Sequence, residues 1–168
     1  TGGAPNTITG SRGYVVTSPV TNGNAVIRTG ADSINTGLTA LYAVASLNTN
    51  GISGFIAIDS VGATLTSTLG DAIVAQGVNG NITIGGLNGG IASSVDAPSG
   101  WGIATFSGAD VNVTLAATGS ITALGGISVS GDASVASFGT ISASSLPAIR
   151  MTGQGNFTVT LYDGFTNS

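Results

Sequence analysis

A degenerate internal repeat runs through most of this chain. From about residue 24, a small residue followed by a β-branched residue recurs at intervals of 18 to 30 residues. These pairs are Ala25-Val26, Ala43-Val44, Ala72-Ile73, Gly102-Ile103, Gly126-Ile127 and Ala148-Ile149. Periods of about 20–50 residues are typical of proteins that stack one structural unit on the next. The repeat therefore restricts the fold more strongly than any other property of the sequence.

Each repeat also contains short segments with strand character. A second β segment follows each pair, at residues 32–35, 55–58, 81–84, 111–115, 134–136 and 157–161. The middle repeats carry a third segment, at residues 64–66, 90–92, 120–123 and 140–143. Apolar residues alternate with small polar ones, and Gly, Asn, Asp or Ser separate the segments. This pattern indicates half-buried strands.

One repeat cannot bury its apolar side alone, but stacked repeats can. Each strand then pairs with the equivalent strand of the next repeat, and the inward aliphatic residues form columns. We therefore predict an all-β parallel β-solenoid of about six coils. In this fold Ile73, Ile103 and Ile127 contact one another from coil to coil. The alternative is a β-sandwich or jelly roll, which requires hairpins, but the Asn-Gly dipeptides do not recur at a hairpin rhythm.

The first residues do not follow the repeat. We expect residues 1–23 to form an N-terminal extension or cap, with a strand at residues 13–17, and residues 24–168 to form the solenoid domain. The end of a solenoid exposes unpaired backbone groups and needs a cap or a partner. Because the sequence starts at Thr1 and its only methionine is Met151, we expect a processed chain or an excised fragment.

The composition excludes several kinds of chemistry within this chain. It has no His, Cys, Lys or Glu, and its charged residues are three arginines and seven aspartates, 6% of the total. Zinc and haem sites, Ser-His-Asp or Cys-His nucleophiles and the P-loop are therefore excluded, and we expect no cofactor. A net charge of -4 also argues against a nucleic-acid partner. No apolar run is long enough to span a membrane as a helix.

Three stretches, at residues 70–75, 111–131 and 138–144, carry a loose pattern of Gly-x-Ile and x-Val-x-Val segments separated by turns. With them, residues 24–161 resemble the passenger repeats of bacterial autotransporter and filamentous-haemagglutinin-type adhesins. The resemblance implies a right-handed parallel β-helix on a secreted or outer-surface bacterial protein, used in adhesion or as a stalk.

We accordingly predict a non-catalytic extracellular structural protein, an adhesin stalk or a filament subunit that assembles through β-strand stacking. Its expected partners are copies of itself or surface glycans. One alternative is a β-helix that binds or cleaves polysaccharide, for which Asp71, Asp110 and Asp132 are the candidate carboxylates. Another is an ice-binding solenoid. Its candidate hydroxyl pairs are Thr64/Thr66, Ser120/Thr122, Thr140/Ser142 and Thr158/Thr160.

Further surface candidates are Trp101, Arg28 and Arg150. Trp101 is expected to cap the core at a long turn or to contact a ligand. Arg28, in the first coil, and Arg150, in the last, belong either to solvated strand faces or to contacts with acidic groups of neighbouring subunits. Asn81, Asn112 and Asn156 each begin an Asn-x-Thr sequon at the start of a second strand. These sequons are either glycosylation sites or a turn feature that keeps the same register in three coils.

Overall fold

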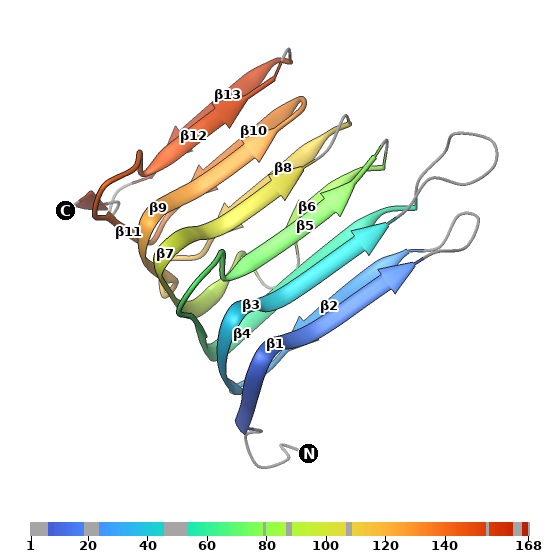
Figure 1. Ribbon diagram of the computed structural model, residues 1–168. Helices are drawn as coiled ribbons and strands as arrows, with labels where there is room; N and C mark the ends of the chain where they lie inside the picture. The colour runs from blue at the N-terminus through green and yellow to red at the C-terminus, as the bar shows by residue number, and fades with distance from the viewer. Residues whose placement is uncertain are drawn as a thin grey trace.

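All pairings between the described strands are parallel. The computed structural model describes residues 7–18, 24–45, 54–78, 80–86, 89–106, 109–153, 155–162 and 166–167. In these ranges the chain forms fourteen strands and no helix. The strands follow one another in chain order along the molecule (Figure 1). Because sandwiches and jelly rolls are built from antiparallel strands, the described residues exclude that alternative and confirm parallel pairing.

The strands form three rows, and within each row every strand pairs with the next one along the chain. Row 1 contains β2 (Ala25–Thr29), the first part of β4 (Ile56–Ser67), β6 (Ile82–Ile84), β8 (Val111–Leu115), β10 (Ala133–Ser137) and β13 (Phe157–Leu161). Row 2 contains the first parts of β1 (Thr7–Ser18), β3 (Ser33–Ala45), β7 (Ala92–Phe106) and β9 (Ser120–Ser130). It also contains β11 (Thr140–Ala143), β14 (Thr166–Asn167) and the second part of β4. Row 3 contains the second parts of β1, β3, β7 and β9, with β5 (Ile73–Gly77) and β12 (Ile149–Thr152).

The chain visits rows 1, 2 and 3 in the same order each time, and we call one such passage a repeat. A residue lies beside its counterpart 20 to 32 residues later. Long strands pass from one row to the next without a break. β7, for example, changes register between Ala97 and Trp101 as it leaves row 2 for row 3.

Columns of aliphatic side chains form the core between the rows. Ile73 pairs with Ile103, and Ile103 pairs with Ile127, as the sequence predicts. All three side chains are completely buried. The buried aliphatic residues of the three rows belong to one continuous core. Because strands in a sheet lie about 4.8 Å apart, each inward side chain packs directly on its counterparts in the adjacent repeats.

The pairs of a small and a β-branched residue mark the repeats in the sequence. Two of these repeat markers, Ala25-Val26 and Ala43-Val44, are in the wrong register. Ala25 begins β2 in row 1, whereas the other markers lie at the entry to row 3. The counterpart of Ile73 is Leu41 and not Val44. The matching pairs in the first two repeats are therefore Gly13-Tyr14 and Ala40-Leu41. Two predicted segments are also misplaced. Residues 32–35, predicted to be equivalent to the segments of row 1, lie at the start of row 2. The counterparts of residues 64–66 are residues 94–96 and not residues 90–92, of which Ala92 begins β7 beside Val61.

The small residue of the marker has a physical cause. At the corner between rows 2 and 3, the backbone of one repeat passes very close to that of the next. A Cβ atom at Gly13 would collide with the carbonyl of Ala40, and one at Gly126 would collide with the carbonyl of Ala148. The repeat marker thus records a close approach of two backbones.

The N-terminal segment contributes a regular member of the stack. The strand expected at residues 13–17 is part of β1, which pairs with β3 over most of its length. Its side chains Ile8, Tyr14 and Val16 pack against the core.

Candidate functional site

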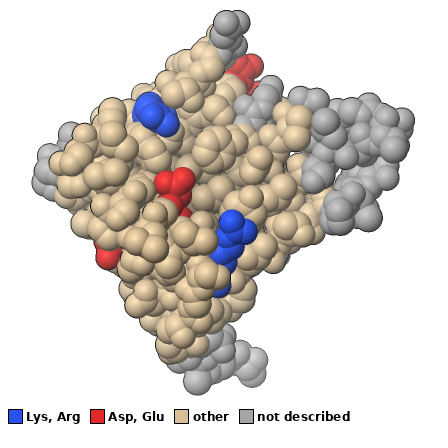
Figure 2. Space-filling model, in the orientation of Figure 1, with Lys and Arg blue, Asp and Glu red and all other residues tan. Residues whose placement is uncertain are grey.

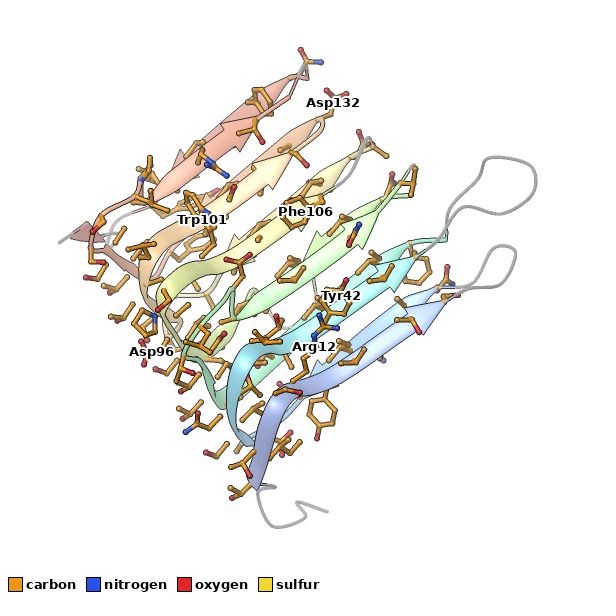
Figure 3. All side chains as sticks on the ribbon, viewed as in Figure 1. Arg12, Tyr42, Asp96, Trp101, Phe106 and Asp132 are labelled. Atoms are coloured by element: carbon orange, nitrogen blue, oxygen red, sulfur yellow. The ribbon has the colours of Figure 1, made fainter. Side chains whose placement is uncertain are left out.

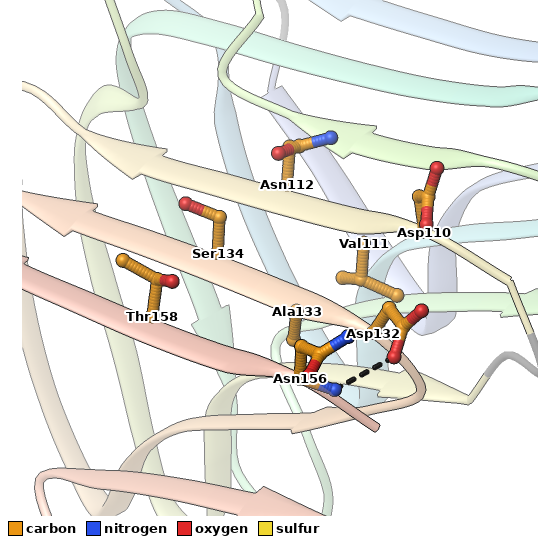
Figure 4. A pocket seen from close by; sticks show the side chains of 8 residues that line it. All are labelled: Asp110, Val111, Asn112, Asp132, Ala133, Ser134, Asn156 and Thr158. Atoms are coloured by element: carbon orange, nitrogen blue, oxygen red, sulfur yellow. Dashed lines mark hydrogen bonds between the residues drawn. The ribbon is translucent and has the colours of Figure 1, made fainter.

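A shallow polar depression lies on the outer side of row 1, where β8, β10 and β13 begin (Figure 4). Its volume of about 270 Å³ is slightly below the range of about 300–1,000 Å³ found for ligand pockets. It is lined by Asp110, Val111, Asn112, Asp132, Ala133, Ser134, Asn156 and Thr158. The predicted carboxylates Asp110 and Asp132 therefore lie in one depression, and Asp71 is not part of it.

The aspartates also hold the corners of the fold together. The carboxylate of Asp132 accepts a hydrogen bond from the backbone N–H of Asn156, one repeat later, at 2.7 Å. Asp71 accepts one from the backbone N–H of Trp101 at the corner before row 3, also at 2.7 Å. Each carboxylate thus accepts a hydrogen bond that a backbone carbonyl would accept within a strand, at a corner where the regular backbone hydrogen bonds between strands are interrupted. Both carboxylates therefore have a structural role.

The depression offers carboxylate, amide and hydroxyl oxygens to a small polar molecule. Within the described ranges, no group of three or more metal-ligating side chains could hold a metal ion. The same ranges contain no helix that is long and apolar enough to cross a membrane.

The three Asn-x-Thr sequons do not share one register. Asn81 and Asn156 immediately precede β6 and β13, but Asn112 lies within β8, where it pairs with Thr83. The counterpart of Asn81 is therefore Asp110. All three asparagines are exposed. The expectation of a common register is wrong, because a common register would align Ile82 with Val113, whereas Ile82 aligns with Val111.

Arg28 lies on the outer side of row 1, directly beside Asp59 of the next repeat. The two residues line a second depression together with Phe55, Thr83 and neighbouring residues. Asp59 is only 4% exposed although it faces outward, so this part of row 1 is closely covered by its neighbours.

Trp101 packs on the outer side of row 3. It is only 8% exposed and contacts Val74 and Ala104, with Tyr42 at the edge of the cluster. The guanidinium of Arg150 lies 4.5 Å from the centre of its ring, and Arg12 lies 4.7 Å from that of Tyr42 (Figure 3). Nε of Arg150 also donates a hydrogen bond to Ser128. Trp101 is thus buried under an arginine and offers little surface to a ligand.

The outer side of row 2 carries two columns of short polar side chains, here called the hydroxyl ladder. The first column contains Thr7, Ser33, Thr64, Ser94, Ser120 and Thr140. The second contains Thr9, Asn35, Thr66, Asp96, Thr122 and Ser142. The sequence predicted three of these six pairs. The predicted pair Thr158/Thr160 lies in row 1 and does not belong to the ladder.

Among the described residues outside these features, Asp32 is the only one with a charged side chain. Figure 2 shows one face of the molecule, on which isolated Arg and Asp side chains are separated by wide areas of other residues.

No family model, curated protein or solved structure matches this chain. Its function is therefore inferred from the geometry of the three rows and from the sequence pattern.

Proposed function

We propose that the chain is a right-handed parallel β-solenoid of about six coils and that it is a non-catalytic structural protein of the bacterial outer surface. In this proposal it acts as a stalk or filament subunit, and copies join end to end. The right-handed coil and the surface location come from the resemblance to adhesin passenger repeats. The three rows and their constant order along the chain support the solenoid.

Buried hydroxyl groups give the stack additional support. Thr29 Oγ1 lies 2.6 Å from Ser60 Oγ, which lies 2.8 Å from Ser93 Oγ. Ser93 also accepts a hydrogen bond from the backbone N–H of Ala63. These three side chains link successive repeats inside the core, where unpaired hydroxyls would be costly. Such links along the stacking direction suit a protein with a mechanical role.

The observation that carries end-to-end assembly is the exposed inner side of β13. Phe157, Val159 and Leu161 are 39%, 45% and 50% exposed. Their counterparts one repeat earlier, Ala133, Val135 and Ser137, are at most 5% exposed. Side chains that point into the core elsewhere in row 1 thus meet solvent at this end of the stack.

The first strand of row 1 in a second copy is a suitable cover for β13. All strands are parallel, so opposite ends of the stack offer complementary edges, and a head-to-tail contact extends into an open filament. If β2 of the next copy continues row 1 in register, its small Ala25 lies over the large Phe157 and its Ile27 lies over Val159. Strand addition of this kind is a known mode of association.

The test compares the wild type with two variants of β13. Val159→Asp places a charge on the exposed inner side, whereas Thr158→Asp places the same charge on the outer side of the same strand. We expect sedimentation and negative-stain microscopy to show fibres for the wild type and for Thr158→Asp, and short single particles for Val159→Asp. Single particles for the wild type at all concentrations contradict the assembly, as does equal loss of fibres in both variants.

A further inference from the structure

We infer that the hydroxyl ladder of row 2 is an ice-binding face. Ten of its twelve positions are Ser or Thr, and Asn35 and Asp96 are the exceptions. Every position is exposed or half-exposed. The ladder spans six successive strands of row 2 without interruption. This inference goes beyond the proposed structural role, because end-to-end assembly does not use the outer side of row 2.

The other two rows have no comparable surface. The outer side of row 1 mixes Val26, Arg28 and Ala57 with polar residues, and that of row 3 carries Tyr42 and Phe106. Figure 3 shows Asp96, a member of the ladder, at a different side of the molecule from Tyr42 and Phe106. The uniform chemistry of row 2 is therefore a property of one face and does not follow from the overall composition.

The ladder is held rigidly from below. Each of its pairs flanks one inward aliphatic residue, and Ile34, Leu65, Val95, Ile121 and Ile141 are at most 1% exposed. The backbone of each inner strand is paired on both sides. Thr side chains are also stiff about χ1 because they are β-branched. The hydroxyl groups consequently occupy fixed positions with little conformational entropy left to lose on binding.

Fixed hydroxyls on this backbone form a grid with two regular spacings. Neighbouring strands lie about 4.7–4.9 Å apart, and alternate residues of one strand lie about 6.6 Å apart. A repeating grid matches a ligand that itself repeats in two dimensions. Crystalline water is such a ligand, and each of its oxygens can bond to a hydroxyl as donor or acceptor.

The chemistry of the ladder favours ice over a carbohydrate. Carbohydrate and other small-molecule sites are usually concave, with aromatic side chains and a few converging polar groups. The ladder contains no aromatic residue, and its one carboxylate is that of Asp96. Asp96 is also its weakest point, because a charged group keeps its own hydration shell.

The test measures thermal hysteresis and inhibition of ice recrystallisation. Thr122→Tyr places a bulky ring in the middle of the ladder, and Thr160→Tyr makes a matched change on the exposed outer side of row 1. We expect activity in the wild type, loss of most of it in Thr122→Tyr and no change in Thr160→Tyr. Asp96→Thr is expected to raise the activity. Circular dichroism establishes that each variant is folded.

Two results would overturn the inference. One is the absence of thermal hysteresis and recrystallisation inhibition in the folded wild type. The other is a wild-type protein that binds cellulose or chitin but has no effect on ice, and that loses this binding in Thr122→Tyr. This result would show that the ladder binds a polysaccharide. Neither result affects end-to-end assembly, because that proposal depends on β13.

Discussion

The carboxylate of Asp71 accepts a hydrogen bond from the backbone N–H of Trp101, with 2.7 Å between Oδ1 and N. The two residues belong to successive repeats and lie at the corner before row 3. Asn24 and Asp132 make equivalent contacts with Phe55 and Asn156 at the corner before row 1. Corner side chains of this kind replace the backbone acceptor that a continuous strand would supply.

Removal of the Asp71 carboxylate is therefore expected to weaken the stack. A hydrogen bond to a charged group contributes about 1.5–3 kcal/mol, and Asp71→Ala should lower the free energy of unfolding by about that amount. Asp71→Asn keeps an acceptor oxygen and should lower it less. Urea denaturation followed by circular dichroism measures both changes. Equal stability of the alanine variant and the wild type would show that the contact contributes nothing.

Two buried serines should respond in opposite ways to replacement by alanine. Ser60→Ala leaves Thr29 without its hydroxyl partner, so the free energy of unfolding should fall by about 1–3 kcal/mol. Ser137 is fully buried, and its hydroxyl has no hydrogen-bond partner among the described residues. Ser137→Ala should therefore raise the free energy of unfolding by about 1 kcal/mol.

Denaturant melts of the two serine variants, made side by side, measure this difference. Both substitutions remove one oxygen from a buried position of row 1, so the change in volume is the same. Destabilisation of similar size in both variants would contradict the distinction between partnered and unpartnered hydroxyls.

Glycines at corners are expected to differ from glycines in open turns. A Cβ atom at Gly126 would collide with the backbone carbonyl of Ala148 and with the side chain of Ile141, whereas one at Gly30 has no atom within 4 Å. Gly126→Ala should lower the free energy of unfolding by about 1–3 kcal/mol because of overpacking. Gly30→Ala should raise it by about 0.4–1 kcal/mol, because the unfolded chain loses conformational freedom.

Thermal and denaturant unfolding of the two glycine variants provide the measurement. If Gly126→Ala unfolds at the same denaturant concentration as Gly30→Ala, the close backbone approach at this corner is not as tight as described.

The parallel stacking could be predicted from the sequence because inward aliphatic residues recur with strand alternation. Ile73, Ile103 and Ile127 were identified correctly for this reason. The first two repeats were misaligned because their corners use other residues: Leu41 stands where later repeats have Ile, and the tyrosine of Gly13-Tyr14 is not β-branched. Insertions of different length also change the spacing, so a fixed period cannot identify equivalent positions.

The hydroxyl ladder was only half predicted, for a related reason. Ser94-Val95-Asp96 occupies row 2, but the apolar Ile91 before it predicts a strand four residues earlier, at residues 90–92. Ile91 instead forms a bridge with Leu115 at the end of row 1. A search for Ser or Thr, then an aliphatic residue, then Ser, Thr, Asn or Asp would have found all six pairs. The corner contacts of the aspartates could not be predicted, because they depend on where the backbone ladder is interrupted.

The pairing of each strand with its neighbours in chain order has a consequence for the protein under load. Among the described strands, no pairing joins the first repeat to the last. A force that pulls the two termini apart is therefore expected to unfold the repeats one after another. When a single molecule is stretched, its length should then increase in separate steps, and each step should correspond to the unfolding of one repeat of roughly 20 to 30 residues. The protein would thus lengthen gradually under force while its remaining repeats stay folded.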